Sequence, residues 1–524
     1  MTHVNRRKFL ASTSIALAGP MAASDLLLAQ LGAASAADAN AKPGSIRQTP
    51  DIESLVALIR NTPRSQCVAA FVRELQQGLS YHDFLSALFL ATFEHGDPHQ
   101  VAQVYAAHRL ASESPVADRL LPLFWVLDRI ALGFEEQPPR PLTEFGSDLP
   151  AIDRGASAFE EAMARHDGAE AERTIVAVAR AHGPRQAMAR LWKHGLRRVG
   201  GSFGHHPIMI ANAYRTLDAL NWERAEPVLR YLASGFSQNE SDRAYEPNRQ
   251  RVRQIASDLP DDWTGGPASR SATFDLYNVL RQGDTGQSCD LICAELASGR
   301  MTAATAWDAI HLTASDLIYR YKTGGLPIGG AMIHAITSTN ALRFGFNAVE
   351  NEGVRVLMIL QGAAALGDVF LADATKDDRL RDMNLLNLAA ENVAAGDHGS
   401  APSAVDAIFE RLPYKADLYI QKSPDERAAS DEACKSAFAL LANPSNHRPF
   451  VQAARRLLCA KATSNPHDVK YPIAIIEDAG SASPEWRPYL LASAVHALHG
   501  TASDDSATLV AARRALGETK TGSG

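Results

Sequence analysis

Cysteine is scarce in this sequence, and its five cysteines form no recognisable metal or disulfide pattern. There is no CxxC pair and no haem-attachment CxxCH motif. The chain also lacks a glycine-rich phosphate loop, the H-E-x-x-H helix of zinc proteases and the paired E-x-x-H of ferritin-like di-iron bundles. We therefore expect neither a disulfide framework nor a thiolate cluster, and none of these familiar nucleotide or metal sites.

A strong excess of positive charge is missing too. The formal net charge is -7, and the basic residues are scattered rather than gathered into a stripe, so nucleic acid is not an expected partner. No apolar run is long and uninterrupted enough to predict a membrane span. With 46% hydrophobic and 21% charged residues, the composition is that of an ordinary soluble protein with ample length for a buried core.

The N-terminus reads as an export signal. Residues 5–10 (Asn-Arg-Arg-Lys-Phe-Leu) have the form of a twin-arginine signal, and Ala34-Ser-Ala36 fits an A-x-A cleavage site. We expect residues 1–36 to be a signal peptide and residues 37–48 a polar linker. The mature protein would then lie in the bacterial periplasm or beyond.

Most of the remaining chain has apolar residues at helical spacing, and strand-like alternation is scarce. The sequence therefore predicts an all-α fold: a large multi-helix domain over residues 49–500 around a central histidine-lined cavity. The Pro/Gly/Ser-rich stretch Asp258–Arg270 is either a long loop or a boundary between two helical lobes. Residues 501–524 are small and polar, which predicts a flexible tail.

Gly200-Gly-Ser-Phe-Gly204 matches the letters of the G-x-S-x-G nucleophile elbow of hydrolases. That motif requires a strand before the serine and a helix directly after it. Here a helical pattern ends near Leu196 and the next begins at Pro207. We therefore predict that Ser202 is a loop residue and not a nucleophile.

Three histidines lie on predicted apolar helix faces. His82 shares a face with Leu85 and Phe89, His206 stands at a helix entrance before Pro207, and His334 has small neighbours that leave room for a metal or a substrate. Each has a plain alternative as a core or capping histidine. The neighbouring His205 is predicted to point outward. His95 and His99 are predicted to lie in a solvated turn, because Gly96-Asp-Pro98 breaks the helix between them.

His467 and Lys470 are three residues apart and would share one helix face. An ammonium repels a metal cation, so this lysine suits a metal site only if its nitrogen is chemically altered. Burial depresses the pKa of a lysine, and a neutral amine can add carbon dioxide to give a carbamate, which binds metal as a carboxylate does. The plain alternative is a surface lysine whose stem covers apolar residues. Pro472 could kink the helix just beyond the pair.

Four segments together resemble the questin oxidase family, which is known from fungal anthraquinone pathways and from many bacterial proteins. The likeness runs discontinuously from about residue 78 to 500. The segments are 81–90 with Val104-Tyr105; 204–210; 307–312 followed by 333–342; and 466–472 with 484–493.

The resemblance implies a mononuclear non-haem iron oxygenase with several histidine ligands and a carboxylated lysine. Carried over by residue, the ligands would be His82, His206, His334, His467 and Lys470. Four imidazoles and one carbamate would hold Fe(II) and leave about one octahedral position free.

The expected reaction is ring opening or Baeyer–Villiger-type oxidation of a hydrophobic or polycyclic aromatic substrate by dioxygen, with NADPH as a candidate reductant. We place His311, Ser338 and Asn340 in the substrate pocket. Two other functions fit the same residues: a periplasmic helical ligand-binding protein, and a zinc-dependent hydrolase that uses the histidine cluster.

Overall fold

The computed structural model describes residues 51–516, apart from residues 96, 140–148, 152, 239, 323–328, 377–378, 392–400, 413–422 and 464. The predicted export signal and linker lie outside the described residues. Within the described ranges the chain is helical and contains no strand; an isolated bridge joins Tyr321 to Leu380. The all-α prediction is confirmed.

The first part of the chain forms helices α2 to α12. Their bounds are α2 Ile52–Asn61, α3 Arg64–Gln76, α4 Tyr81–His95, α5 Pro98–Glu113, α6 Leu121–Glu136, α7 Gly155–Ala164, α8 Gly168–His182, α9 Pro184–Gly195, α10 His205–Ala219, α11 Ala225–Ser237 and α12 Tyr245–Ile255.

The second part forms helices α13 to α25. Their bounds are α13 Arg270–Leu280, α14 Thr285–Ala297, α15 Ala303–Arg320, α16 Gly329–Ala348, α17 Glu352–Ala365, α18 Ala372–Thr375, α19 Leu388–Glu391, α20 Ala401–Arg411, α21 Pro424–Leu441, α22 His447–Lys461, α23 His467–Ser481, α24 Arg487–Ala494 and α25 Ala507–Ala515.

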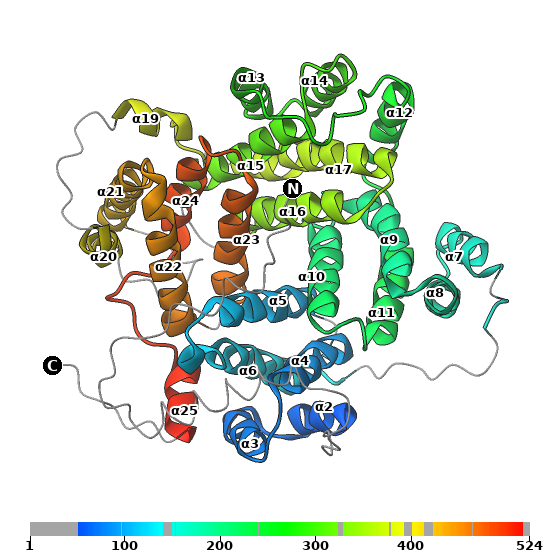
Figure 1. Ribbon diagram of the computed structural model, residues 1–524, viewed down its shortest axis with the longest axis vertical. Coiled ribbons are helices and arrows are strands. Elements are labelled where there is room, and N and C mark those ends of the chain that lie inside the picture. Colours follow the sequence, from blue (N-terminus) through cyan, green and yellow to red (C-terminus); the bar gives the residue numbers. More distant parts are fainter. Residues whose placement is uncertain are drawn as a thin grey trace, which may run out of the picture.

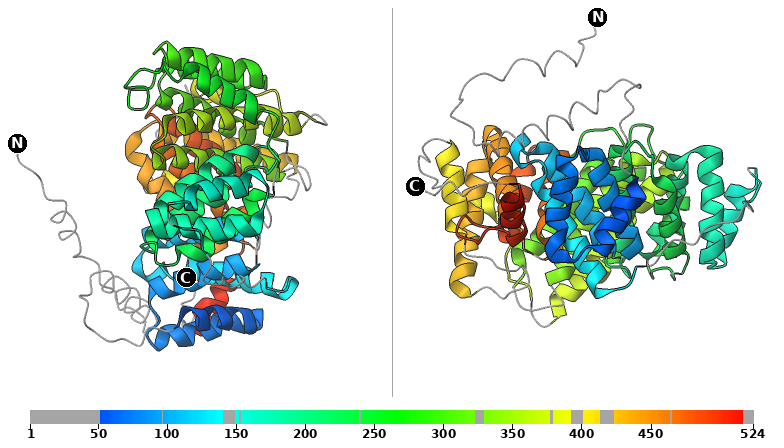
Figure 2. Two further views of the ribbon diagram at one scale, coloured as in Figure 1. Left: turned by 90° about the vertical axis from the view of Figure 1, so that its right-hand side faces the viewer. Right: turned by 90° about the horizontal axis from the view of Figure 1, so that it is seen from below.

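Four helices from distant parts of the sequence form a square at the centre of the molecule. In Figure 1, α5 and α16 form two opposite sides, and α10 and α23 form the other two. Each helix packs against both of its neighbours in the square. The remaining helices surround this square, from α2 and α3 at one end of the molecule to α13 and α14 at the other (Figures 1 and 2).

The Asp258–Arg270 stretch is a packed loop. Trp263 is 2% exposed, and its carbonyl accepts a hydrogen bond of 2.8 Å from the backbone N–H of Ala303 at the start of α15. Buried apolar side chains from Ile52 to Leu516 form one cluster. A single core therefore runs through the described part of the chain.

The predicted flexible tail must be corrected. Residues 507–515 form α25, which packs on α3 and α6. Leu509, Ala512 and Leu516 are buried in this contact, at one-turn spacing along the helix. The polar composition concealed a short amphipathic helix. Residues 517–524 lie outside the described residues.

Among the described residues, one helical run has the length and apolar composition of a membrane span. It extends over Glu352–Thr375, through α17, a π-helical turn at Leu366–Leu371 and α18. Most of it is buried against neighbouring helices, as is usual for the core helix of a soluble protein. Its composition alone does not show a membrane span.

Candidate metal centre

Four histidine rings meet inside the square of helices. Ligand nitrogens of His99, His334 and His467 all lie within 4.8 Å of one another. The Nε2 atom of His205 lies 3.2 Å from that of His99, and the ring centre of His205 is 4.5 Å from that of His334. The rings come from α5, α10, α16 and α23, so each side of the square contributes one histidine.

Two of these rings are held by the same local motif, Asx-Pro-His. In Asp97-Pro-His99, the Asp97 carboxylate caps α5 by accepting the His99 backbone N–H at 2.8 Å and lies 3.0 Å from the His99 Nδ1. In Asn465-Pro-His467, the Asn465 side-chain oxygen makes the corresponding contacts, at 2.9 and 3.2 Å. One oxygen thus fixes both the helix start and the ring, with Pro at a position that suits a helix start.

His205 is fixed by a glycine turn. Gly204 has φ +78°, a left-handed conformation, and a Cβ there would overlap with the side chain of Ser338 on α16. Only glycine lets the start of α10 approach α16 so closely. The Ser202 carbonyl then accepts a hydrogen bond from the His205 Nδ1 at 2.6 Å.

Oxygen acceptors beside the Nδ1 atoms determine which nitrogen of each ring is protonated. Asp97, Ser202 and Asn465 all present oxygen acceptors to Nδ1, so Nδ1 carries the proton and Nε2 carries the lone pair. The lone pairs of His99 and His205 therefore face each other at 3.2 Å. Two adjacent ligands of an octahedral metal, each at about 2.1 Å, would be separated by about 3.0 Å. The arrangement fits a bound metal ion.

Lys470 completes the cluster. It lies in the first turn of α23 and is 4% exposed, and its Nζ has no hydrogen-bond partner among the described residues. Burial lowers the pKa of its amine to about 7, and the Asp97 carboxylate opposes that shift. Much of the amine is therefore neutral at neutral pH. The helix continues through Pro472, which removes one hydrogen bond to the carbonyl four residues earlier.

Burial also keeps the imidazoles neutral. The pKa of His205 falls to about 3 through burial and the nearby His99 and Lys470. Burial and Lys470 lower the pKa of His467 well below its usual value, and they lower that of His99 against the opposing effect of Asp97. Neutral imidazoles are the form that binds metal, so these three rings need not lose a proton to bind a cation at neutral pH.

The predicted ligands divide into two groups. The structure brings the rings of His334 and His467 together, and Lys470 lies near enough to His467 to lower its pKa. It places His82 and His206 elsewhere, and His99 and His205 take their positions in the cluster. His82 is 37% exposed and lies beside Asp83, whose hydrogen bond raises its pKa. His206 packs its ring on Phe236, with centres 4.6 Å apart.

The predicted pocket residues also differ in their surroundings. Asn340 lines a small cavity that Lys470 also lines. Ser338 instead forms the packing contact with Gly204, and its hydroxyl donates to the Ala335 carbonyl at 3.2 Å. His311 is buried on α15 with its Nδ1 3.3 Å from an Asp478 carboxylate oxygen. The cavity lining therefore includes Asn340 but neither Ser338 nor His311.

The serine of the G-x-S-x-G match is a loop residue, as predicted. Its hydroxyl donates to the Arg198 carbonyl at 2.5 Å, and the chain around it forms turns rather than a strand. The strand–serine–helix arrangement of a nucleophile elbow is absent from this described segment.

Comparison with protein-family models, curated proteins and solved structures gives no match to this chain. The likeness to the questin oxidase family therefore rests on the motifs quoted above, and the function is argued below from the chemistry of the cluster.

Proposed function

We propose that the protein is a non-haem iron oxygenase whose metal is held by His99, His205, His334, His467 and a carboxylated Lys470. The observation that carries this proposal is the Lys470 amine, which is buried close to His99, His205 and His467 and has no hydrogen-bond partner in the described structure. A buried polar group without a partner is costly, so a ligand or a modification at the Lys470 amine would remove that cost.

The electrostatics around Lys470 favour an anion at this position. His99, His205 and His467 all stand in the first turn of their helices, so the positive ends of α5, α10 and α23 converge on the cluster. These helix ends disfavour an ammonium and stabilise a negative group. The neutral amine can add to carbon dioxide to form a carbamate, releasing one proton, and the product supplies an anionic oxygen ligand.

Iron would supply the activation of dioxygen, for which nitrogen ligands and one anionic oxygen ligand are suitable. The protein residues would bind the metal and orient its ligands. Three oxygen acceptors fix the tautomers of the histidine rings, and the surrounding helices exclude water. Transfer of one oxygen atom of dioxygen to an aromatic substrate requires two further electrons and two protons, and the second oxygen atom leaves as water; NADPH is the proposed electron donor. Ring opening or Baeyer–Villiger-type insertion is the proposed reaction class, and export to the periplasm as a folded protein the proposed location.

Metal analysis of the purified mature protein tests the proposal. We expect about one iron per chain, lost in His334→Ala and Lys470→Ala and retained in His82→Ala and His206→Ala. The last two variants are matched controls, since they remove histidines outside the cluster. A ¹³C signal from Lys470 under labelled carbon dioxide would report the carbamate.

The outcomes separate the alternatives. Stoichiometric zinc with hydrolytic activity would favour a zinc-dependent hydrolase. Full folding without bound metal would favour a helical ligand-binding protein. If the His334 and Lys470 variants keep their metal, the proposed ligand set is wrong.

A further inference from the structure

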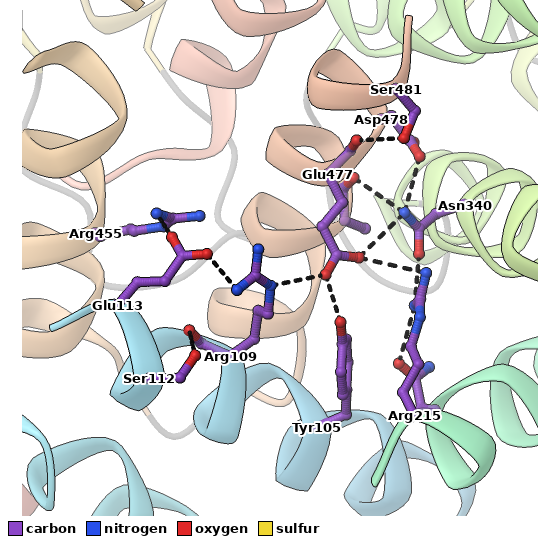
Figure 3. A network of polar contacts seen from close by, with 12 residues as sticks. Tyr105, Arg109, Ser112, Glu113, Arg215, Asn340, Arg455, Glu477, Asp478 and Ser481 are labelled. Atoms are coloured by element: carbon purple, nitrogen blue, oxygen red, sulfur yellow. Dashed lines mark hydrogen bonds and ion pairs between the residues drawn. The ribbon is translucent and has the colours of Figure 1, made fainter. Parts of the chain in front are cut away.

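The four helices that carry the cluster meet a second time at Glu477. This residue lies two turns after Lys470 on α23, about 10 Å along the helix axis. Its carboxylate accepts a hydrogen bond from the Tyr105 hydroxyl at 2.5 Å and lies 3.4 Å from Arg109, both on α5. It also lies 3.4 Å from Arg215 of α10 and from the amide of Asn340 of α16 (Figure 3).

A narrow cavity lies between Lys470 and this network. Lys470 lines it together with Tyr105, Arg215, Asn340 and Glu477. The rest of the wall is largely apolar and includes Ala102, Ala106, Ile208, Ile473 and Ala474. The free volume is about 10 Å³, room for roughly one water molecule. Nothing larger can pass toward Lys470 along this cavity unless a wall moves.

The part of the cavity wall that opens most easily is Glu477 with its polar contacts to Tyr105, Arg109, Arg215 and Asn340, here called the Glu477 network. Arg109 is 37% exposed and Glu477 15% exposed, so the network lies at the outer end of the cavity. Partly exposed ion pairs contribute little to stability, whereas parting the apolar walls would separate packed helices. Movement of the Glu477 side chain would open the cavity without disturbing the helices.

The guanidinium groups of Arg109 and Arg215, at the outer end of the cavity, have other contacts that hold them in place without Glu477. The Arg215 guanidinium lies 4.9 Å from the Tyr105 ring and 4.4 Å from the Phe344 ring, and it donates to Asn340 at 2.9 Å. Arg109 also pairs with Glu113, which in turn pairs with Arg455 (Figure 3). Two guanidinium groups and a tyrosine hydroxyl therefore converge on the place that one carboxylate now fills.

We propose that Glu477 is an internal carboxylate closing the mouth of the cavity, and that a ligand displaces it by binding Arg109 and Arg215 through its own anionic group. Two guanidinium groups suit a ligand with a carboxylate or phenolate head. The cavity has room for about one water molecule, so a planar apolar body would lie outside its mouth, beside the 37% exposed Arg109. That this ligand is the substrate of the histidine cluster rests on the proposed function; anion binding at the mouth does not.

Binding of naphthoate to the metal-free full chain, measured by calorimetry, tests this proposal. We expect Glu477→Gln to bind naphthoate about tenfold more tightly than the wild type, because the internal competitor loses its charge. Arg215→Gln and Arg109→Gln should each weaken binding about tenfold or more. Glu485→Gln, at an exposed position on the following loop, is the matched control and should leave the affinity unchanged.

Two outcomes would overturn the proposal. One is naphthoate affinity that is the same in the wild type, Glu477→Gln and the arginine variants. The other is no detectable binding to the folded Glu477→Gln variant, with circular dichroism matching the wild type. The isosteric Gln keeps Tyr105 and Asn340 within hydrogen-bonding reach, so this variant is expected to fold. Because no metal is present, failure here is distinguishable from failure of the oxygenase proposal.

Discussion

The Nε2 atoms of His99 and His205 face each other at 3.2 Å, while both Nδ1 atoms are bound to oxygen acceptors. With both Nε2 lone pairs unprotonated, this contact is repulsive. A cation bound between the two rings, as proposed, would remove the repulsion.

Replacement of Asp97 should weaken metal binding without removing a ligand. Asp97→Ala loses the acceptor that fixes the His99 ring, and we expect a loss of about 10- to 100-fold in affinity. Asp97→Asn should lose much less, because Asn465 performs the same task for His467 with an amide oxygen. Competition titrations with Co²⁺ on metal-free protein measure the metal affinity of both Asp97 variants and of the wild type. Equal affinity in folded Asp97→Ala and wild type would contradict the assigned role.

The stability of metal-free, carbon-dioxide-free protein should rise with pH above 7 because of Lys470. Burial lowers the pKa of the folded-state amine from 10.5 to about 7, so between these values the unfolded chain binds one more proton than the folded chain. The free energy of unfolding then increases by up to about 1.4 kcal/mol per pH unit.

The control for this pH dependence is Lys470→Met, which keeps an apolar chain of similar length without a titrating group. Urea unfolding at pH 7, 8 and 9 gives the difference between the two proteins. If the wild type does not gain stability over Lys470→Met across this range, the amine is not neutral in the folded state.

Gly204→Ala should destabilise the protein by about 2–4 kcal/mol, since the new Cβ meets Ser338 and the left-handed φ is unfavourable for alanine. Adding Ser338→Gly should relieve the steric part and leave about 2 kcal/mol, from the left-handed alanine and from a glycine inside α16. Gly235→Ala in α11, where a Cβ meets nothing within 4 Å, should be neutral or stabilising. Thermal unfolding compares the three variants. If the double variant is no more stable than Gly204→Ala, the contact with Ser338 is not the cause of the destabilisation.

The C-terminal helix α25 offers a simple packing test. Leu509 is 4% exposed against α3 and α6, and Leu509→Ala should lower the free energy of unfolding by about 2–3 kcal/mol. Its neighbour Val510 is 37% exposed, and Val510→Ala should change stability by less than about 0.5 kcal/mol. Chemical denaturation measures both. Equal effects would indicate that α25 does not dock.

The helical fold follows from sequence periodicity. Periodicity placed His334, His467 and Lys470 on helices but left a core histidine or a surface lysine as plain alternatives, and their joint assignment as ligands came from the family resemblance. His99 could not be predicted, because Gly96 and Pro98 indicate the end of a helix but not the direction of the next ring. Pro98 in fact begins α5. The usable signal was the repetition of Asx-Pro-His at residues 97–99 and 465–467.

The choice between His205 and His206 depended on which buried face of α10 points to the cluster. His206 is in line with Ile210, as predicted, but that face packs against Gly195 and Phe236. His205, about 100° away around the helix, faces His99 and His334. The convergence on Glu477 was beyond sequence reasoning, because it joins residues whose proximity only the tertiary fold creates.

Tyr105 and Glu477 are separated by 372 residues, and Gln103 bonds the Pro466 carbonyl across a similar interval. The fourth side of the central square is therefore synthesised last. A chain truncated before residue 467 lacks His467, Lys470 and one side of the square, so it cannot assemble the cluster. If the cluster binds a metal as proposed, such a chain would be distinguishable by its inability to retain it.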